Sequence, residues 1–251
     1  MSYKVSKNFE NHLSSILDLI NTFDSIGTVF GNSDRNVIKT VDFEGLTLNI
    51  KSFKEPHFIN QIAYQYFRKS KARRSFEYAT ILKEKGVATP NPIAYFEFKK
   101  GIGFGKSFYI SEHLTPDLTY RELVHQPGIP NHEHILRAFT RFTFQLHEKG
   151  VEFQDHSPGN TLIFLGEDKI KFSLVDLNRM KFKELNFQER MFNFRRLTPK
   201  KDMVEVMSDE YAKLIDKPKA EVFKLMWEFT SEFQRKFHQK QKRKKKIKSL
   251  F

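Results

Sequence analysis

The sequence contains no cysteine among its 251 residues. Disulfides, a thiol nucleophile and a cysteine metal site are therefore excluded, which fits a reducing compartment. No apolar run is long enough to cross a bilayer. The opening residues, MSYKVSKNFENHL, are too polar for a secretory signal, so we expect a cytoplasmic protein. The hydrophobic content of 39% and the 27 phenylalanines instead predict a globular chain with a real core.

Acidic residues are missing from the C-terminal end of the chain. From Arg235 to Phe251 there are nine Lys/Arg and no Asp/Glu, so this segment carries +9 of the net charge of +13. Such a run is expected to be disordered in isolation. It is either a solubilising end or a segment that binds a polyanion, with Leu250 and Phe251 favouring an anionic membrane surface. Residues 1–234 carry only +4, which makes nucleic acid an unlikely partner.

The first half of the chain is rich in predicted β structure. Apolar spacing predicts an amphipathic helix over residues 8–23. Glycine punctuation and β-rich stretches then predict three antiparallel strands, the last being Leu46–Phe53. A helix is expected from about Asn60 to Lys85, ending at Gly86. Two strands around the turn GIGFG follow and end near His113.

The second half is predicted to be mostly helical. Asn131 is expected to cap a helix that ends at Gly150. A hairpin follows, turning at residues 166–168, and a last helix runs into the basic tail. The expected organisation is an N-terminal helical extension (1–25), a β-rich N-lobe (26–115), a helical C-lobe (116–236) and a basic tail (237–251). The fold class is α+β, and we expect a monomer.

Five polar residues on these elements form a pattern typical of phosphoryl transfer. Protein kinases use a strand lysine, a helix glutamate, an aspartate five residues before an asparagine, and a later metal-binding aspartate. Residues of these types occur here in the same order: Lys51, Glu77, Asp155, Asn160 and Asp176. Each alone fits an ordinary surface or turn residue, and the ordered set carries the prediction. The oxygen ligands suit Mg²⁺, so ATP and Mg²⁺ are the expected cofactors.

The segments IKSFKEP, FRKSKARRSFEYA, FQDHSPGNTL and LVDLNRMKF resemble the lipopolysaccharide kinase (Kdo/WaaP) family, over about residues 25–200. The resemblance implies a protein-kinase-like fold with a small antiparallel N-lobe and a compact helical C-lobe. It also implies Mg-ATP-dependent phosphorylation of a sugar hydroxyl of the lipopolysaccharide inner core, at the cytoplasmic face of the inner membrane.

By that likeness each of the five residues has a role. Lys51 would hold the ATP phosphates and Glu77 would pair with it. Asp155 would be the catalytic base, and Asn160 and Asp176 would bind metal.

Some positions depart from the protein-kinase pattern. Phe153-Gln154 stands where His-Arg usually precedes the catalytic aspartate, and no Ala-Pro-Glu segment is present. The absence of an ordinary activation segment favours a small-molecule acceptor over a protein. In the expected phosphate loop, FGNSDRNVIK, Gly31 and Arg35 are the nucleotide-binding candidates, although a plain hairpin fits as well. Glu112, at the crossing between the two lobes, is a further nucleotide-binding candidate.

Basic residues after Asp176 are candidates for binding an acceptor that bears carboxylates or phosphates. They are Arg179, Lys181, Arg195 and Arg196. Two alternatives to the lipopolysaccharide kinase remain: a kinase for another small molecule or a protein, and a kinase-shaped module without catalysis. The intact set of five polar residues disfavours the second alternative.

Overall fold

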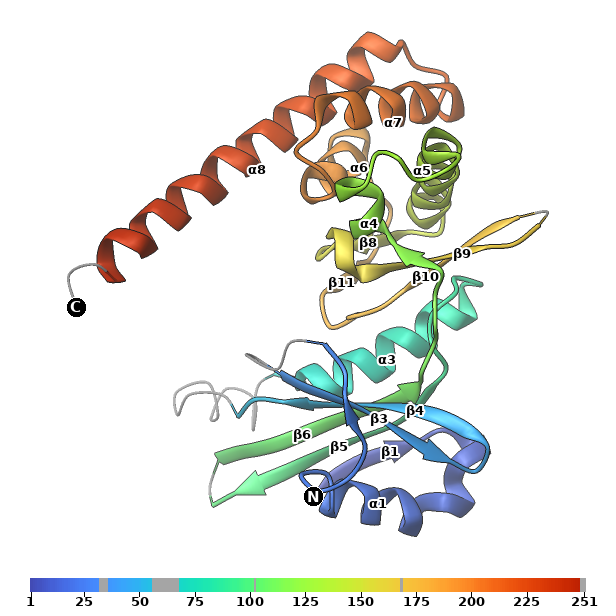
Figure 1. Ribbon diagram of the computed structural model, residues 1–251, viewed down its shortest axis with the longest axis vertical. Coiled ribbons are helices and arrows are strands. Elements are labelled where there is room, and N and C mark those ends of the chain that lie inside the picture. Colours follow the sequence, from blue (N-terminus) through green and yellow to red (C-terminus); the bar gives the residue numbers. More distant parts are fainter. Residues whose placement is uncertain (32–35, 56–67, 102, 168, 249–251) are drawn as a thin grey trace. The chain divides into compact units, whose positions relative to one another are not determined.

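The computed structural model describes all residues except 32–35, 56–67, 102, 168 and 249–251. The chain divides into two units, one of Met1–Thr115 with Asp176–Asn178, and one of Pro116–Val175 with Arg179–Phe251. Each is described by itself below, with the labels of Figure 1. No helix among the described residues is long and apolar enough to span a membrane.

The first unit is built on a six-stranded antiparallel sheet in the order β1-β5-β6-β4-β3-β2. The strands are β1 (Ser2–Val5), β2 (Thr28–Val29), β3 (Asn36–Phe43), β4 (Leu46–Phe53), β5 (Pro92–Lys100) and β6 (Gly103–Glu112). The predicted strand over residues 46–53 is confirmed with those bounds. Strand β1 was not predicted, and it brings the N-terminal segment into the sheet by pairing with β5.

Helices cover both faces of this sheet (Figure 1). One face carries a 3₁₀ helix, η1 (Lys7–His12), and α1 (Leu13–Asn21), in place of the single helix predicted over residues 8–23. Ile16 and Ile20 of α1 pack with Leu48 and Ile50 of β4, because alternate strand residues face the same side. Phe53 packs on the other face, against α3 (Lys71–Glu84).

Helix α3 begins later than the sequence suggests. Residues 68–70 are not helical, and the Ser70 side chain caps the first turn by accepting a hydrogen bond from the Arg73 amide at 3.0 Å. The predicted start near Asn60 falls outside the described residues, but a helix continuous from there to Lys85 is wrong. The predicted end is confirmed: the chain leaves the helix through Gly86, whose φ is +64°.

The second unit is mostly helical with short strands. Its strands are β7 (Leu118–Thr119), β8 (Val151–Phe153), β9 (Thr161–Leu165), β10 (Ile170–Leu174) and β11 (Met180–Phe182). Its helices are α4 (Tyr120–His125), α5 (His132–Glu148), η2 (Pro158–Asn160), α6 (Phe187–Asn193), η3 (Phe194–Arg196), α7 (Lys201–Leu214) and α8 (Lys219–Lys248). Strands β9 and β10 form the predicted hairpin, with Leu165 opposite Ile170.

Two predictions about helix ends in this unit concern α5 and α8. Asn131 stands at the predicted N-cap position of α5, but its backbone is left-handed (φ +59°) and its side chain makes no capping hydrogen bond. The predicted last helix is confirmed as α8, which continues through the basic tail to Lys248, while disorder of the tail in isolation stays a prediction. The helix is nucleated where Val222 and Met226 pack into the core, and lysine, arginine and glutamine propagate a helix well once it has started.

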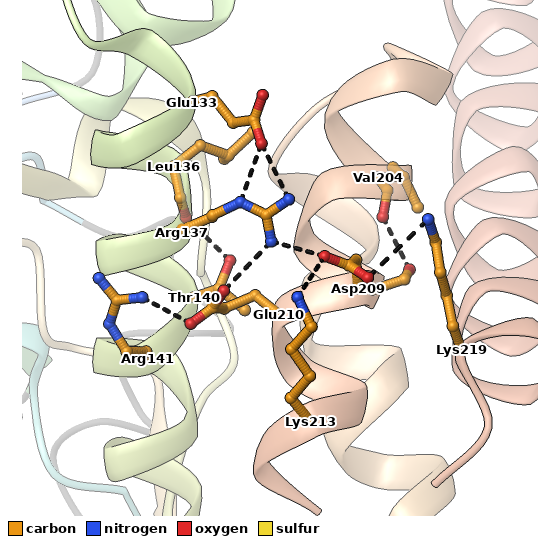
Figure 2. Close-up of polar contacts among 11 residues, drawn as sticks. Glu133, Leu136, Arg137, Thr140, Arg141, Val204, Asp209, Glu210, Lys213 and Lys219 are labelled. Atoms are coloured by element: carbon orange, nitrogen blue, oxygen red, sulfur yellow. Dashed lines mark hydrogen bonds and ion pairs between the residues drawn. The ribbon is translucent and has the colours of Figure 1, made fainter.

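An ion-pair network ties α5 to α7 (Figure 2). The Arg137 guanidinium contacts Glu133 one turn earlier and reaches Asp209 and Glu210 of α7, with Nη1–O distances of 2.7 and 3.2 Å. Arg141 also pairs with Glu210. A guanidinium shared among several carboxylates fixes the two helices more firmly than an isolated surface pair would.

Candidate active site

Lys51 projects from β4 on the sheet face that carries α3. Its neighbours Leu48 and Ile50 are fully buried in the cluster on the α1 side, so alternation turns Lys51 the other way, with Phe53. The Lys51 Nζ lies 5.3 Å from the centroid of the Phe53 ring. The Lys51 side chain is only 11% exposed, so its ammonium is largely shielded from solvent.

The Lys51 ammonium pairs with Asp176, a residue 125 positions further along the chain. The Nζ–Oδ1 distance is 2.7 Å, and Asp176 belongs to the short segment 176–178 that groups with the first unit. Asn178 Nδ2 also donates to the same oxygen, at 2.6 Å. The sequence pattern predicts that this lysine and this aspartate lie at one site, and the structure brings them together.

Asp176 adopts a left-handed backbone conformation, with φ at +56°. A non-glycine residue in this region is strained and persists only when its surroundings hold it there. Here the flanking residues Leu177 and Asn178 are buried and Lys51 holds the carboxylate.

Glu77 lies on α3 but has different partners from the one expected. Its Oε2 accepts from Lys69 at 2.8 Å and its Oε1 from Arg73 at 2.9 Å. Burial raises the pKa of Glu77, but the hydrogen bonds from Lys69 and Arg73 outweigh it and hold the pKa below its usual value. The expected Lys51–Glu77 ion pair is therefore not formed. Lys51 pairs with Asp176, and the two Glu77 oxygens pair with Lys69 and Arg73.

Asp155 and Asn160 lie in one tight loop between β8 and β9. The Asn160 Nδ2 donates to the Asp155 carbonyl at 2.9 Å, and the Asp155 carbonyl also accepts from the Ser157 amide at 2.7 Å. The Asn160 carbonyl accepts from the amide of Val175, the residue before Asp176, at 3.0 Å. The loop is thus closed on itself by backbone and amide hydrogen bonds, which fixes the side chains that project from it.

Asn160 and Asp176 each carry an oxygen of the type that a hard cation such as Mg²⁺ prefers. The Asn160 amide nitrogen is used inside the loop, so the amide oxygen remains as an acceptor. Lys51 and Asn178 both donate to Oδ1 of Asp176, so neither of them uses its second carboxylate oxygen. Within the part of the chain that is described, no group of three or more His, Cys, Asp or Glu side chains is arranged around a metal position. A magnesium ion that keeps waters and substrate oxygens needs only one or two protein ligands.

Two arginines contact the Asp155 carboxylate. Arg196 Nη2 lies 2.9 Å from Oδ1, and Arg179 Nη1 lies 3.8 Å from Oδ2. The other two basic candidates have different surroundings. Lys181 faces Glu152 at 3.7 Å, and the Arg195 guanidinium stacks over the Phe192 ring, 3.5 Å from its centroid. Burial, together with the neighbouring charge of Arg196, lowers the pKa of Arg195.

A buried chain of hydrogen bonds supports the loop, and no pattern in the sequence predicts it. Asn193 Nδ2 donates to the carbonyl of Phe153, two residues before Asp155, at 2.9 Å. The Asn193 Oδ1 lies 3.2 Å from His147 Nε2, and His147 Nδ1 lies 2.8 Å from the Tyr211 hydroxyl. These residues come from three helices, so only the fold reveals that they meet.

The surroundings of the remaining nucleotide-binding candidates do not point to a particular ligand. Gly31 has φ at +76° and open space where a Cβ would stand, as a loop glycine does. Arg35 lies outside the described residues. Glu112 accepts a hydrogen bond from Asn91 Nδ2 at 2.6 Å at the end of β6. His156, next to Asp155, is fully buried against the rings of Phe139 and Phe153, and burial lowers its pKa to about 3.

Comparison with known proteins identifies the fold. A solved structure of WaaP in complex with acyl carrier protein matches 95% of this chain and 99% of its own, with 16% identity and a TM-score of 0.61. A MAP kinase of Leishmania major matches 84% of this chain and 69% of its own, at 16% identity and a TM-score of 0.43. No curated protein sequence matched. The WaaP likeness shows the fold, and the predicted kinase-like α+β class is confirmed.

A match to a protein-family model shows the family to which the sequence belongs. The model described as "Lipopolysaccharide kinase (Kdo/WaaP) family" matches residues 35–217, a range that contains all five residues of the phosphoryl-transfer pattern. The resemblance seen in the sequence is confirmed. This chain belongs to the lipopolysaccharide kinase (Kdo/WaaP) family and, as a member of a kinase family, is a phosphotransferase.

Proposed function

We propose that this protein transfers the γ-phosphate of ATP, with Mg²⁺, to a sugar hydroxyl of the lipopolysaccharide inner core, on Kdo or heptose. The observation that carries the proposal is the 2.7 Å contact between Lys51 and Asp176. A strand ammonium and a late aspartate are two parts that phosphoryl transfer requires, for the phosphates and for the metal. Family membership supports the choice of acceptor.

In the proposed reaction each residue of the pattern has one task. The acceptor hydroxyl oxygen forms a bond to the γ-phosphorus, the bond from that phosphorus to the bridging oxygen breaks, and ADP leaves. Asp155 orients the hydroxyl and takes its proton. Lys51 holds phosphate oxygens, and Glu77 is placed by its own ion pairs on the neighbouring helix. Asn160 and Asp176 would hold Mg²⁺, which neutralises charge on the phosphates when bound.

The Asp155–Arg196 pair fits this task. A carboxylate held by a guanidinium at 2.9 Å has a fixed orientation. Arg179 is farther from Asp155, at 3.8 Å, and its side chain is 58% exposed. With Lys181 and Arg195 it remains our proposed contact for carboxylates or phosphates of the acceptor. Gly31, Arg35 and Glu112 remain proposed contacts for the nucleotide.

The test uses labelled ATP, Mg²⁺ and isolated lipid A–core precursors, with the full chain. We expect label transfer by the wild type and a loss of at least 10²-fold in Asp155→Ala and Asp176→Ala, since each removes a group acting at the reacting centre. Both variants should keep the wild-type melting temperature within a few degrees. Transfer that survives in both folded variants would refute the assignment.

Other acceptors are separated by the same assay. If the wild type binds Mg-ATP but labels no core precursor, a screen of other sugars and of proteins decides whether it is a kinase with a different acceptor. Failure to bind ATP at all would instead favour a kinase-shaped module without catalysis.

We also propose that the basic end of α8 binds an anionic membrane surface, which places the protein at the cytoplasmic face of the inner membrane. Charge complementarity supports this: from Arg235 onward the chain has nine cations and no acid. Phe237 and Ile247 of this helix are exposed, at 47% and 58%. Since the matched WaaP structure contains acyl carrier protein, that protein is the competing partner to test.

Vesicle sedimentation distinguishes these partners. We expect the full chain to sediment with phosphatidylglycerol vesicles but not with phosphatidylcholine vesicles, and 0.5 M salt (about a 4 Å Debye length) to release it. Replacing Lys244, Lys245 and Lys246 by glutamate should weaken the affinity for the vesicles about 10²-fold or more, because three positive charges at roughly 1 kcal/mol each are lost. Equal sedimentation with both lipids, or binding only to acyl carrier protein, would contradict the membrane proposal.

A further inference from the structure

The loop that carries Asp155 and Asn160 contains no cation of its own. Its six residues are Asp155, His156, Ser157, Pro158, Gly159 and Asn160. His156 is buried and its pKa is lowered to about 3, so it is neutral near pH 7. Phosphoryl transfer develops negative charge on the phosphate oxygens, and fixed cations stabilise that charge. Any positive side chain at this loop must therefore come from another element.

Arg121 of α4 supplies such a side chain at Gly159. A Cβ built on Gly159 would lie 2.6 Å from the Arg121 Nη2 and 3.4 Å from its Cζ. The guanidinium thus occupies the space that any other residue at position 159 would fill. Gly159 is not in the left-handed region, so its backbone conformation does not demand glycine. Because the guanidinium is the flexible end of a side chain, a Cβ at position 159 would displace it at little cost to the backbone.

No carboxylate holds the Arg121 guanidinium directly. Among the described residues no hydrogen bond or ion pair joins it to an acid, the residue is exposed, and its charge acts on the neighbouring Glu122 only through space. The neighbouring Glu122 is occupied in the capping box of α4, where its carboxylate accepts from the Thr119 backbone amide and hydroxyl. Other arginines of the second unit differ: Arg137 and Arg141 are held by acids in the network of Figure 2.

We propose that Arg121 is a further catalytic residue, whose guanidinium contacts phosphate oxygens at the loop between Asp155 and Asn160. This inference rests on the proposed kinase function. A planar guanidinium matches the oxygens of a phosphate better than an ammonium does. Two sources of phosphate share this chemistry: the γ-phosphate of the nucleotide, and a phosphate group already present on a phosphorylated sugar acceptor.

The experiment compares the wild type with Arg121→Ala, using a non-hydrolysable ATP analogue, ADP and the labelled transfer assay. If Arg121 contacts the γ-phosphate, the variant binds the triphosphate about tenfold more weakly, the loss of one charge-assisted hydrogen bond, and binds ADP within twofold. If it contacts a phosphate on the acceptor, nucleotide affinity is unchanged and the KM of the acceptor rises about tenfold.

Two more variants keep the test sharp. Gly159→Ala retains the charge but displaces the guanidinium, so it should reproduce the defect of Arg121→Ala without a matching loss of melting temperature. Arg141→Ala removes an arginine of the same unit, 42% exposed and paired with Glu210, and should leave affinity and KM unchanged.

The outcomes also separate this inference from the function on which it rests. A wild type that fails to bind the triphosphate refutes the proposed function itself. A wild type that binds and transfers, while folded Arg121→Ala stays within twofold of it in triphosphate affinity, acceptor KM and kcat, overturns the role of Arg121 alone.

Discussion

Two lysines on neighbouring strands show how much a single residue depends on its surroundings. Lys51 of β4 meets a carboxylate, whereas Lys39 of β3 meets only backbone carbonyls. In sequence, both are lysines in β-rich stretches. Lys51 was singled out because a glutamate, an asparagine and two aspartates follow it in the order that kinases use. Nothing in the sequence marks Lys39, because the carbonyls that it reaches lie 13–16 residues earlier in the chain.

Lys39 holds the end of α1. Its Nζ donates to the carbonyls of Phe23, Asp24 and Ile26, at 2.7, 3.0 and 2.9 Å. Carbonyls beyond the end of a helix lack donors within the helix, and a cation there is favoured by the helix dipole. The side chain is 8% exposed, so water does not replace these bonds easily. The ammonium is therefore structural, and the first unit depends on it.

We predict that Lys39→Met lowers the free energy of unfolding by about 2–3 kcal/mol, since the apolar stem stays and the buried carbonyls lose their donor. Urea unfolding followed by circular dichroism measures this. Lys99→Met, at an exposed lysine of β5, is the matched control and should change stability by less than about 0.5 kcal/mol. Equal losses in both variants would show that the three hydrogen bonds contribute nothing beyond a surface lysine.

At the scale of elements, the sequence predicts those that have strong alternation or clear turn residues. It does not predict the shortest elements. Strand β4 and the β9–β10 hairpin were predicted because several residues in a row agree on one period. Strand β1 has four residues and depends on pairing with β5, which no local pattern reveals. The last helix was predicted from the apolar spacing of its first half, and its packed start explains why the solvated basic end is helical too.

The loop that carries Asp155 is likewise held by elements whose contacts the sequence does not reveal. Asn193 at the end of α6 bonds the Phe153 carbonyl on β8, and His147 and Tyr211 hold Asn193 from α5 and α7. The polar groups are buried, so each unsatisfied one would cost about 1–3 kcal/mol. This chain of hydrogen bonds therefore sets the backbone from which Asp155 projects two residues later, and Asn193 acts as a positioning residue.

We predict that Asn193→Leu lowers kcat about tenfold or more with acceptor and ATP KM values within threefold, because Asp155 shifts while the binding residues stay. The free energy of unfolding should also fall by about 2–4 kcal/mol. Steady-state kinetics and urea unfolding provide both values.

Tyr211→Phe provides the matched control for Asn193→Leu. It removes only the far hydroxyl, so it should cost about 1 kcal/mol and leave kcat nearly unchanged. Asn193→Leu with wild-type kcat would show that the loop does not need this support.

At the scale of the whole molecule, the two buried histidines make the second unit sensitive to acid. Burial lowers the pKa of His147 to about 4 and, with the nearby His147, that of His156 to about 3. Both are therefore neutral when folded, whereas in the unfolded chain they take up a proton near pH 6.5. Below pH 6.5 the unfolded state binds more protons, so stability present above that pH is lost as the pH falls toward 4 and 3.

We predict that the free energy of unfolding falls by roughly 4 kcal/mol between pH 7 and pH 5, about 2 kcal/mol for each histidine. Trp227, the sole tryptophan, packs against the core of the second unit and reports its unfolding by fluorescence. His156→Phe keeps an aromatic ring between Phe139 and Phe153 but removes one titrating group, so the fall should be about half as large. His134→Gln, at an exposed histidine of α5, should keep the full pH dependence. If His156→Phe is as acid-sensitive as the wild type, protonation of His156 does not limit the stability of this unit.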